Sequence, residues 1–408
     1  MVAPVTAKAL KDTKLFEPIK VGKNEFSNRV VFAPSTRFRA LEDNTPSDLQ
    51  LDYYDARTSF PGTLIITEGT VPTTKTGTYP NVPAITTDAH VKAWKKINDK
   101  IHENKSFSSI QLWGLGRVAD PAQNKKEGQK FKGASAIYND EETEKAAKEA
   151  GNELEAYTTE EVDDLIEEYV KTGQRAVEAG FDYVELHGAH GYLINQFFEA
   201  SSNQRTDKYG GSIENRARFA LSLVDRLSEA IGAEKLAIRI SPWAKFLGMK
   251  SEEDKEAHPV ATYSYFLGQL QQRADAGKEL AYVSIVEPRV AGNLDVNAED
   301  VVGDNSFVKL IWKGTLLRAG NYTYDAPDFK QLLDDLSDGR TLVGFSRYFI
   351  SNPDLVQRLH DGKELTPYDR SSFYRYDNWG YNTYPTSEGK EKFDEEAEKA
   401  HKPAPIKA

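Results

Sequence analysis

The sequence predicts an α/β protein folded as a (β/α)8 TIM barrel, with an N-terminal hairpin and excursions after the third and sixth strands. Eight short apolar segments recur along the chain, and most of them are followed by a helical segment. This succession uses nearly all of the 408 residues and contains no obvious linker. We therefore expect one domain over residues 1–386 and a charged C-terminal tail over residues 387–408 that is a solvated helix or disordered.

The strand segments follow from short apolar runs bounded by turn residues. Residues 14–29 alternate weakly around Gly22 and are expected to form the N-terminal hairpin. The eight expected barrel strands are residues 30–36, 63–69, 108–113, 182–187, 236–242, 281–287, 315–321 and 341–347.

The helices are predicted from their start and stop signals. Thr158 and Glu161 have the capping-box spacing, Ser212 is a candidate N-cap, Asp325 is expected to cap a short helix, and Pro353 is placed at a helix start. The expected helices are residues 47–59, 88–104, 158–179, 213–231, 260–277, 325–336 and 353–362. The excursions at 114–157 and 288–305 are interpreted as lids over a pocket or as plain insertions.

A doubly wound open sheet is the competing architecture. It requires a phosphate-binding glycine turn after an early strand, and Gly114-Leu-Gly-Arg-Val-Ala119 is one near match. The residues that follow are Asp120-Pro-Ala-Gln-Asn-Lys-Lys, which do not form an apolar helix. Because the motif needs that helix, we discard the open sheet.

Composition narrows the function. The chain has no cysteine, which excludes disulfides, thiolate nucleophiles, Cys-ligated zinc and iron–sulfur clusters. Its formal net charge is −11, so we expect no nucleic-acid partner and no binding to anionic membranes, and a small-molecule substrate instead. No apolar run is long enough to span a bilayer, and no signal peptide is evident, so a cytoplasmic location is expected.

Titratable groups cluster where the fourth strand ends. His187 closes the strand, and His190 and Tyr192 follow between glycines. Three such groups in six residues favour an active site over histidines that merely satisfy backbone groups. A metal held by Glu185, His187 and His190 is the weaker alternative, because no further ligand is evident from the spacing, and we expect no metal.

Polar residues also lie on the inward faces and ends of other strands. Gln111 and Arg239 are expected to point into the barrel, which suggests a polar planar ligand; the alternative is an arginine paired with Glu68 or Glu185. The ends of strands seven and eight are the usual phosphate-binding corner of this fold. They supply Gly320, Asn321, Ser346 and Arg347, which suit a phosphate monoester unless Arg347 pairs with a surface acid.

Several collinear blocks then resemble one family. They are residues 31–40, 61–69, 187–198, 203–219, 239–242, 318–321 and 342–355, and the longest reads Asn-Gln-Arg-Thr-Asp-Lys-Tyr-Gly-Gly-Ser-Ile-Glu-Asn-Arg-Ala-Arg-Phe. Over residues 14–385 the chain resembles the Old Yellow Enzyme family of FMN-dependent NADPH dehydrogenases or ene-reductases, and most of all its yeast members. The resemblance implies tightly but non-covalently bound FMN, NADPH as reductant, and α,β-unsaturated ketones or aldehydes as substrates, in a monomer or homodimer.

The resemblance also implies roles for individual residues. Thr36 would hydrogen-bond the flavin carbonyl next to N5, and Arg239 would lie at the N1–O2 edge, where a fixed cation stabilises the charge of the reduced flavin. Pro34, Ser35, Gly69 and Gln111 would line the flavin, and Gly320, Asn321, Ser346 and Arg347 would hold its phosphate end. His187 and His190 would bind the substrate oxygen, and Tyr192 would donate a proton. The substrate would also be surrounded by Tyr79, Trp113, Phe246, Leu294 and Tyr374.

Three positions depart from the family pattern. His190 stands where many relatives have asparagine, Ser346 where glycine is common, and Leu294 where some relatives carry an aromatic residue. Two other classes of function stay open from the residues alone. A barrel lyase or isomerase acting on a phosphorylated metabolite would explain the phosphate corner but not Gln111 and Thr36. A flavin-storage protein without turnover would not need Tyr192.

Overall fold

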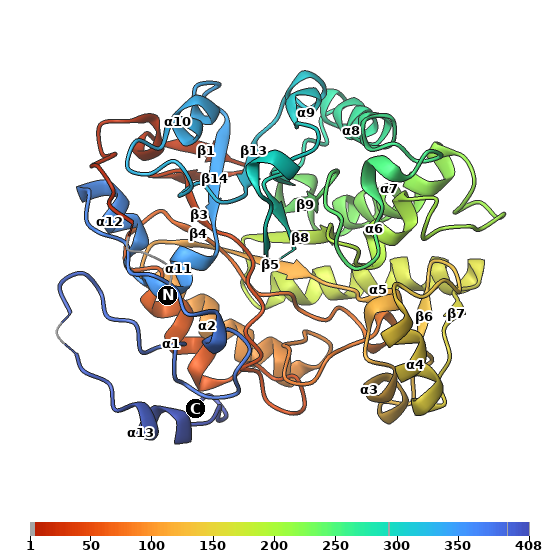
Figure 1. The fold of residues 1–408 in the computed structure, drawn as a ribbon, viewed down its shortest axis with the longest axis horizontal. Coiled ribbons are helices and arrows are strands. Elements are labelled where there is room, and N and C mark those ends of the chain that lie inside the picture. Colours follow the sequence, from red (N-terminus) through yellow and green to blue (C-terminus); the bar gives the residue numbers. More distant parts are fainter. Residues whose placement is uncertain (1–4, 293, 390, 408) are drawn as a thin grey trace.

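A closed barrel of eight parallel strands forms the centre of the protein (Figure 1). The computed structural model describes residues 5–292, 294–389 and 391–407. In order round the barrel the strands are β3 Val30–Phe32, β4 Leu64–Ile66, β5 Phe107–Leu112, β8 Tyr183–Gly188, β9 Leu236–Ile240, β10 Tyr282–Val286, β13 Leu316–Ala319 and β14 Thr341–Phe345. All eight expected strands are confirmed. Most end earlier than expected, because their last residues leave the ladder and line a cavity.

The expected helices are confirmed with small shifts in their bounds. They are α1 Asp48–Ala56, α2 Asp88–Glu103, α5 Thr159–Glu178, α7 Ile213–Ile231, α8 Pro259–Asp275, α10 Lys330–Leu336 and α12 Leu355–Asp361. The predicted capping box of α5 is present: the Thr158 hydroxyl accepts from the Glu161 N–H, and the Glu161 carboxylate accepts from the Thr158 N–H at 2.8 Å. Ser212 caps α7 as predicted.

Two helix starts were placed wrongly from the sequence. The helix assigned to Asp325 begins at Lys330, because Phe329 at its N-cap position adopts the left-handed conformation (φ 51°). The Asp325 carboxylate still accepts from the Gln331 N–H at 2.9 Å, so the capping interaction exists without the expected helical turn. The helix assigned to Pro353 begins at Leu355.

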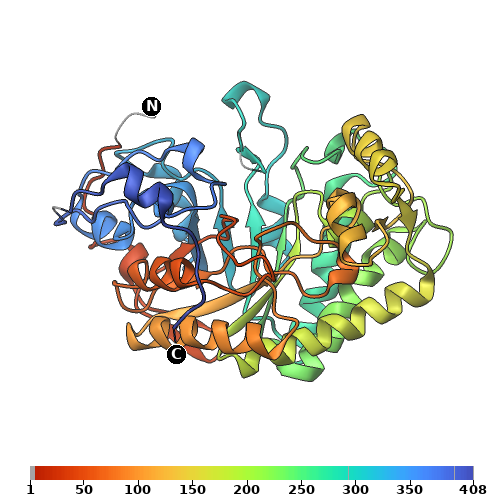
Figure 2. The same ribbon diagram turned by 90° about the horizontal axis from the view of Figure 1, so that it is seen from below.

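Short elements that the sequence did not predict fill the connections. The helices are α3 Pro121–Lys126, α4 Glu141–Ala150, α6 Leu193–Phe198, α9 Ser306–Ile311 and α11 Arg347–Ser351. In the charged tail, where a solvated helix or disorder was expected, α13 Glu395–Ala400 forms a helix without buried residues. The short 3-10 helices are Lys14–Phe16, Thr74–Thr76, Gly116–Val118, Ala233–Lys235, Ser251–Glu253, Ala298–Asp300 and Arg370–Ser372. In the first excursion, β6 Lys132–Gly133 pairs in parallel with β7 Glu155–Ala156. In the second, β11 Val290–Ala291 and β12 Leu294–Asp295 form a hairpin that stands out from the barrel (Figure 2).

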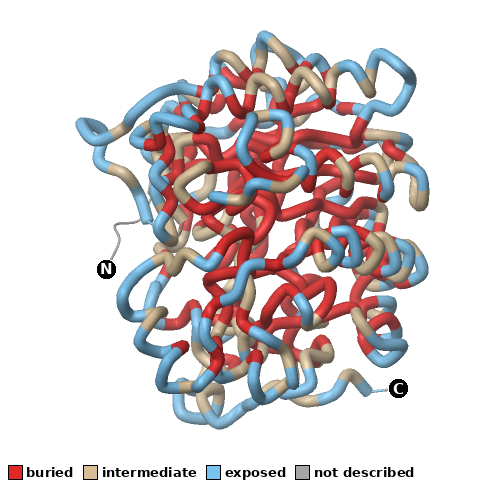
Figure 3. Tube along the Cα trace, turned by 90° about the vertical axis from the view of Figure 1, so that its right-hand side faces the viewer, coloured by how far each residue is buried: buried red, intermediate tan, exposed pale blue. Residues whose placement is uncertain are grey.

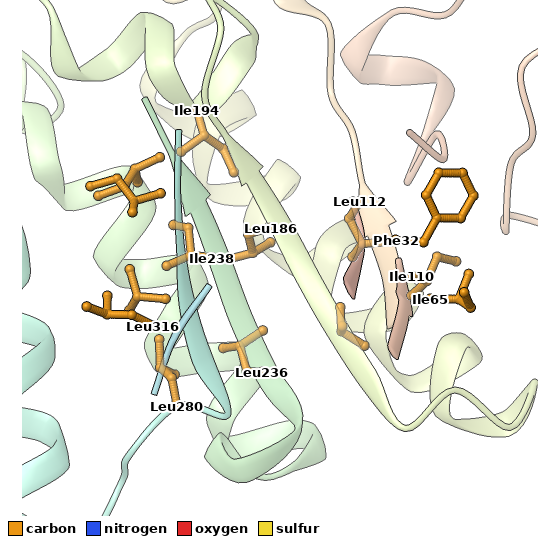
Figure 4. Packing of buried hydrophobic residues seen from close by; sticks show 14 of the residues in the cluster. Phe32, Ile65, Ile110, Leu112, Leu186, Ile194, Leu236, Ile238, Leu280 and Leu316 are labelled. Atoms are coloured by element: carbon orange, nitrogen blue, oxygen red, sulfur yellow. The ribbon is translucent and has the colours of Figure 1, made fainter. Parts of the chain in front are cut away.

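The apolar core has an outer and an inner layer, and burial is concentrated at the centre of the molecule (Figure 3). In the outer layer, strand side chains such as Ile110, Leu186 and Ile238 pack with other buried residues of the cluster (Figure 4). The inner layer fills the lower barrel with Val31, Leu64, Ile66, Tyr183, Ala237, Tyr282, Leu317 and Leu342. Removing this apolar surface from water stabilises the fold by roughly 25 cal/mol per Å².

The predicted N-terminal hairpin closes the lower end of the barrel. It consists of β1 Ile19–Val21 and β2 Asn24–Phe26, paired antiparallel. The Tyr183 hydroxyl donates to the Val21 carbonyl at 2.8 Å, and the Phe26 ring stacks on Phe107 with centroids 4.6 Å apart. The carboxyl end of the barrel is therefore the end that holds a cavity.

The C-terminal segment returns to the body of the protein. After α13, the Ala404 carbonyl accepts from the Asp48 N–H at 2.9 Å, and Pro405 forms a β-bridge with Ser47. The placement of the domain boundary at residue 386 stays a prediction. No helix in the described ranges combines the length and the apolar character that crossing a membrane requires.

Candidate active site

A cavity of about 520 Å³ lies at the carboxyl end of the barrel strands. Every site residue predicted from the sequence lines it. These are Pro34, Ser35, Thr36, Gly69, Tyr79, Gln111, Trp113, His187, His190, Tyr192, Arg239, Phe246, Leu294, Gly320, Asn321, Ser346, Arg347 and Tyr374. Residues that are as far as about 340 positions apart in the sequence thus share one pocket because eight parallel strands end at the same face.

The two histidines and the tyrosine form one cluster in this cavity. The His187 ring lies 4.8 Å from the Tyr192 ring and 6.1 Å from the His190 ring, centroid to centroid. His190 adopts the left-handed conformation (φ 56°), and its N–H donates to the Ser241 hydroxyl at 2.8 Å. Gly191 follows with φ 76°, and a Cβ there would meet the Phe246 carbonyl oxygen at 2.8 Å, so this turn requires glycine.

Burial makes both histidines neutral hydrogen-bond donors. Desolvation, with Arg239 nearby, holds the pKa of His187 and of His190 well below the ordinary value. The Ala189 N–H donates to Nδ1 of His187 at 3.3 Å, so the neutral ring carries its proton on Nε2. Nε2 of His190 is buried and has no hydrogen-bond partner in the described residues, so it is available to a ligand.

Tyr192 is suited to act as an acid. It follows Gly191 directly and occupies the N-cap position of α6. Its ring meets the Trp113 ring edge to face, with centroids 5.0 Å apart. Burial, followed by the neighbouring Tyr79 and Tyr374, raises the pKa of Tyr192 above its ordinary value. The phenol is therefore fully protonated at neutral pH.

Gln111, Glu185 and Arg239 form the polar floor of the site. Gln111 lies opposite Glu185 in the β5–β8 ladder, and its Nε2 donates to Glu185 Oε1 at 2.7 Å. Arg239 lies opposite His187 in the β8–β9 ladder, and its Nε is buried with no hydrogen-bond partner in the part of the chain that the structure describes. Neither alternative partner forms an ion pair with Arg239 among the described residues: the Glu68 carboxylate accepts from Gln50 and from the Arg37 N–H, and the Glu185 carboxylate accepts from Gln111.

The phosphate corner contains an ion pair that the sequence left as an alternative. Nη1 of Arg347 donates to Asp295 Oδ2 at 2.6 Å and to the Tyr368 hydroxyl at 3.0 Å, and Nη2 donates to Asp295 Oδ1. Asp295 belongs to the β11–β12 hairpin, so this excursion reaches over the corner. The Ser346 and Ser35 hydroxyls lie 2.7 Å apart on the same wall.

Aromatic side chains enclose the mouth of the cavity. The Tyr79 ring lies 5.7 Å from Trp113, and its hydroxyl donates to the Val118 carbonyl. Gly69 packs against Trp113, since a Cβ there would come within 2.6 Å of the indole. Leu294 in β12 is 55% exposed, so this side chain contributes to the rim of the cavity and not to its wall.

Other lining residues were not identified from the sequence. They are Ala33, Arg37, Phe38, Val290, Gly292, Ala319, Tyr322, Thr323, Gly344, Phe345, Tyr348, Ile350 and Phe373. Several directly adjoin predicted residues, and that adjacency was the available signal: Phe38 follows Thr36 by two positions, and Phe373 precedes Tyr374. Asp295 carried no signal, because only the folded hairpin brings it to Arg347.

Comparison with known proteins agrees with this geometry. Residues 14–366 match the model of the NADH:flavin oxidoreductase / NADH oxidase family. A probable NADPH dehydrogenase of Candida albicans is 57% identical over 93% of this chain and 92% of its own, and enoate reductase 1 of Kluyveromyces lactis is 44% identical over 93% and 96%. The crystal structure of Old Yellow Enzyme from Pichia sp. AKU4542 superimposes with a TM-score of 0.92 at 47% identity, covering 98% of this chain and 100% of that one.

Fold and site therefore define a flavin-dependent oxidoreductase. The chain belongs to the NADH:flavin oxidoreductase / NADH oxidase family and is an enzyme of the Old Yellow Enzyme type, with FMN as cofactor and NADPH as reductant. The residues present fit FMN: Nε of Arg239 is a buried donor with no hydrogen-bond partner among the described residues, and it lies in a cavity that also offers a guanidinium at its phosphate corner.

Proposed function

We propose that this enzyme reduces the carbon–carbon double bond of α,β-unsaturated ketones or aldehydes at the cavity described above. When bound, FMN supplies the redox chemistry, taking a hydride from NADPH and passing it to the β-carbon of the alkene. The observation that carries the proposal is the cluster of His187, His190 and Tyr192 in one cavity with Arg239.

The histidines polarise the substrate. Nε2–H of His187 and the unpartnered Nε2 of His190 are donors for a carbonyl oxygen. As negative charge develops on that oxygen, both hydrogen bonds strengthen, and each good donor of this kind contributes on the order of 3 kcal/mol to the transition state. Each neutral ring keeps its proton and acts as a hydrogen-bond donor to this oxygen.

Tyr192 delivers the proton that the α-carbon needs. Its hydroxyl is protonated at neutral pH and adjoins His187, so acid and carbonyl clamp act on the same small molecule. Thr36, Gln111 and Arg239 are assigned to the cofactor ring, and Gly320, Asn321, Ser346 and Arg347 to its phosphate end. Tyr79, Trp113, Phe246, Leu294 and Tyr374 are assigned to the substrate.

A colour cycle tests the proposal. The purified protein is expected to be yellow, to bleach when NADPH is added without oxygen, and to regain its colour when cyclohexenone follows. Product analysis should find the saturated ketone. A protein that bleaches with NADPH but regains no colour with a panel of enones and enals would refute the substrate class.

We also propose a cytoplasmic enzyme that is a monomer or a homodimer. The absence of cysteine supports a location that needs no oxidising compartment. Cell fractionation and light scattering on the purified protein test the two statements separately.

A further inference from the structure

A buried carboxylate beneath the site has no role in the mechanism above. Glu185 is completely buried; its Oε1 accepts from Nε2 of Gln111 at 2.7 Å, and the Tyr282 hydroxyl also lies beside the carboxylate. Its Oε2 has no partner at hydrogen-bond distance in the described residues, and neither does Nε of Arg239. Leaving a buried carboxylate oxygen and a guanidinium nitrogen unsatisfied is costly, so this pair calls for an explanation.

The charge on Glu185 is finely balanced. Desolvation raises the pKa of Glu185 to about 7, although Arg239, Gln111 and Tyr282 each offset part of the rise. These groups face Glu185 from β9, β5 and β10, and among them only Arg239 carries a charge. His187, on the same face of β8, is neutral. A change in the charge near Arg239 therefore decides whether Glu185 is ionised.

Hydride transfer brings such a change. When NADPH gives up a hydride and becomes NADP⁺, the bound cofactor gains two electrons and one proton, and the site gains one negative charge. Arg239 is assigned to the edge of the cofactor where this charge collects. The new anion shares this buried site with the Glu185 carboxylate, and repulsion between the two negative charges favours the protonated form of Glu185.

We propose that Glu185 is the counter-charge of Arg239 and a positioning residue for Gln111, and that its carboxylate binds a proton from solvent when the site receives a hydride. The proton returns to solvent when the hydride leaves for the β-carbon of the alkene. Glu185 also orients the Gln111 amide, because Nε2 of Gln111 donates to Oε1 of Glu185 and the amide oxygen is then left to face the cofactor. This inference rests on the proposed function.

The midpoint potential of the flavin, measured against pH, tests the proposal. It would be determined by equilibrium dye titration of the holoenzyme between about pH 6 and about pH 9, for the wild type, Glu185→Gln and Glu199→Gln. Glu199→Gln is the matched control: Glu199 is also a buried carboxylate, but it accepts from the Lys250 N–H outside the cavity. Thermal melting checks that each variant folds.

The expected results follow from the charges. Between about pH 7 and the higher pKa that Glu185 has in the reduced enzyme, the wild type should take up two protons with each electron pair. Below about pH 7 it should take up only one, because Glu185 is then already protonated. Glu185→Gln should take up one proton per electron pair over the whole pH range. At high pH, its ratio of affinities for reduced over oxidised FMN should exceed the ratio of the wild type by at least about tenfold. Glu199→Gln should match the wild type.

Two results would overturn the proposal. One is a folded Glu185→Gln variant with the potential and pH slope of the wild type. The other, which needs no variant, is a flavin-loaded wild type that takes up a single proton over the whole range. Either would leave the proposed function intact, whereas a wild type that binds no FMN would overturn both.

Discussion

Replacing Tyr192 by phenylalanine separates the two halves of the reaction. The substitution removes one hydroxyl and keeps the ring, which contacts Trp113 and His187 at centroid distances of 5.0 and 4.8 Å. The packing of the cavity is therefore preserved, and the change in folding stability should be under about 1 kcal/mol.

The kinetic effect should be much larger and confined to the alkene. A positioned general acid contributes roughly 10²- to 10⁴-fold, which is about 3 to 5 kcal/mol in activation free energy. Burial raises the pKa of Tyr192, so the hydroxyl is a proton donor throughout the neutral range. Reduction of the flavin by NADPH needs no proton from Tyr192 and should be unchanged.

Stopped-flow spectroscopy measures each half separately. The bleaching rate with NADPH reports the first, and the return of flavin absorbance with cyclohexenone reports the second. Tyr138→Phe is the control, because its hydroxyl accepts from the Leu154 N–H outside the cavity. Enone reoxidation at the wild-type rate in Tyr192→Phe would refute the proton-donor assignment.

Three further substitutions test the remaining assignments. His187→Ala combined with His190→Ala should weaken phenol binding by about tenfold or more, measured by the long-wavelength absorbance of the complex. In the wild type, phenol affinity plotted against pH should show no step near pH 6.5 from these rings, because burial lowers the pKa of His187 and of His190. Thr36→Ala should lower the flavin potential and slow bleaching by NADPH. Asp295→Asn frees Arg347 from a partly exposed ion pair worth up to about 1 kcal/mol, so FMN should bind up to about fivefold more tightly by fluorescence quenching.

Each of these three substitutions has a result that would contradict the assignment it tests, and two of them have a matched control variant. Unaltered phenol affinity in the double histidine variant would remove the carbonyl clamp. Thr36→Ser should keep the wild-type potential, and an unshifted potential in Thr36→Ala would argue against the hydroxyl contact. Asp300→Asn changes the same charge in the same excursion, where the Asp300 carboxylate accepts from the Asn297 side-chain amide at 2.9 Å. An equal gain in FMN affinity in this variant would make the Asp295 effect nonspecific.

The parts of the fold with local signals were predictable from the sequence. The capping box of Thr158 and Glu161 marks the start of α5, and the alternation of β5 puts Gln111 inward and Ile110 outward. Helix α6 was missed because all of its side chains are buried, so it has no polar face to give it a period. The return of the C-terminal segment was missed because its contacts, from the backbone of Ala404 to the backbone and carboxylate of Asp48, form only in the folded chain and leave no trace in composition.

The same distinction applies to the candidate site. The sequence placed the polar residues at strand ends, and a barrel necessarily brings those ends together. It did not supply the register between strands, which is what sets Glu185 opposite Gln111. Nor did it supply the tertiary contact between Asp295 and Arg347, because those residues lie in segments that meet only in the folded chain.

The closed lower end of the barrel has a consequence for the binding and release of substrates. The lower end of the barrel is closed by Tyr183, Phe26 and the β1–β2 turn. NADPH and the alkene therefore have to enter the cavity through the same opening, at its aromatic rim. One compound must dissociate before the other can bind, because both use this single opening. A high concentration of either compound should then slow the binding of the other.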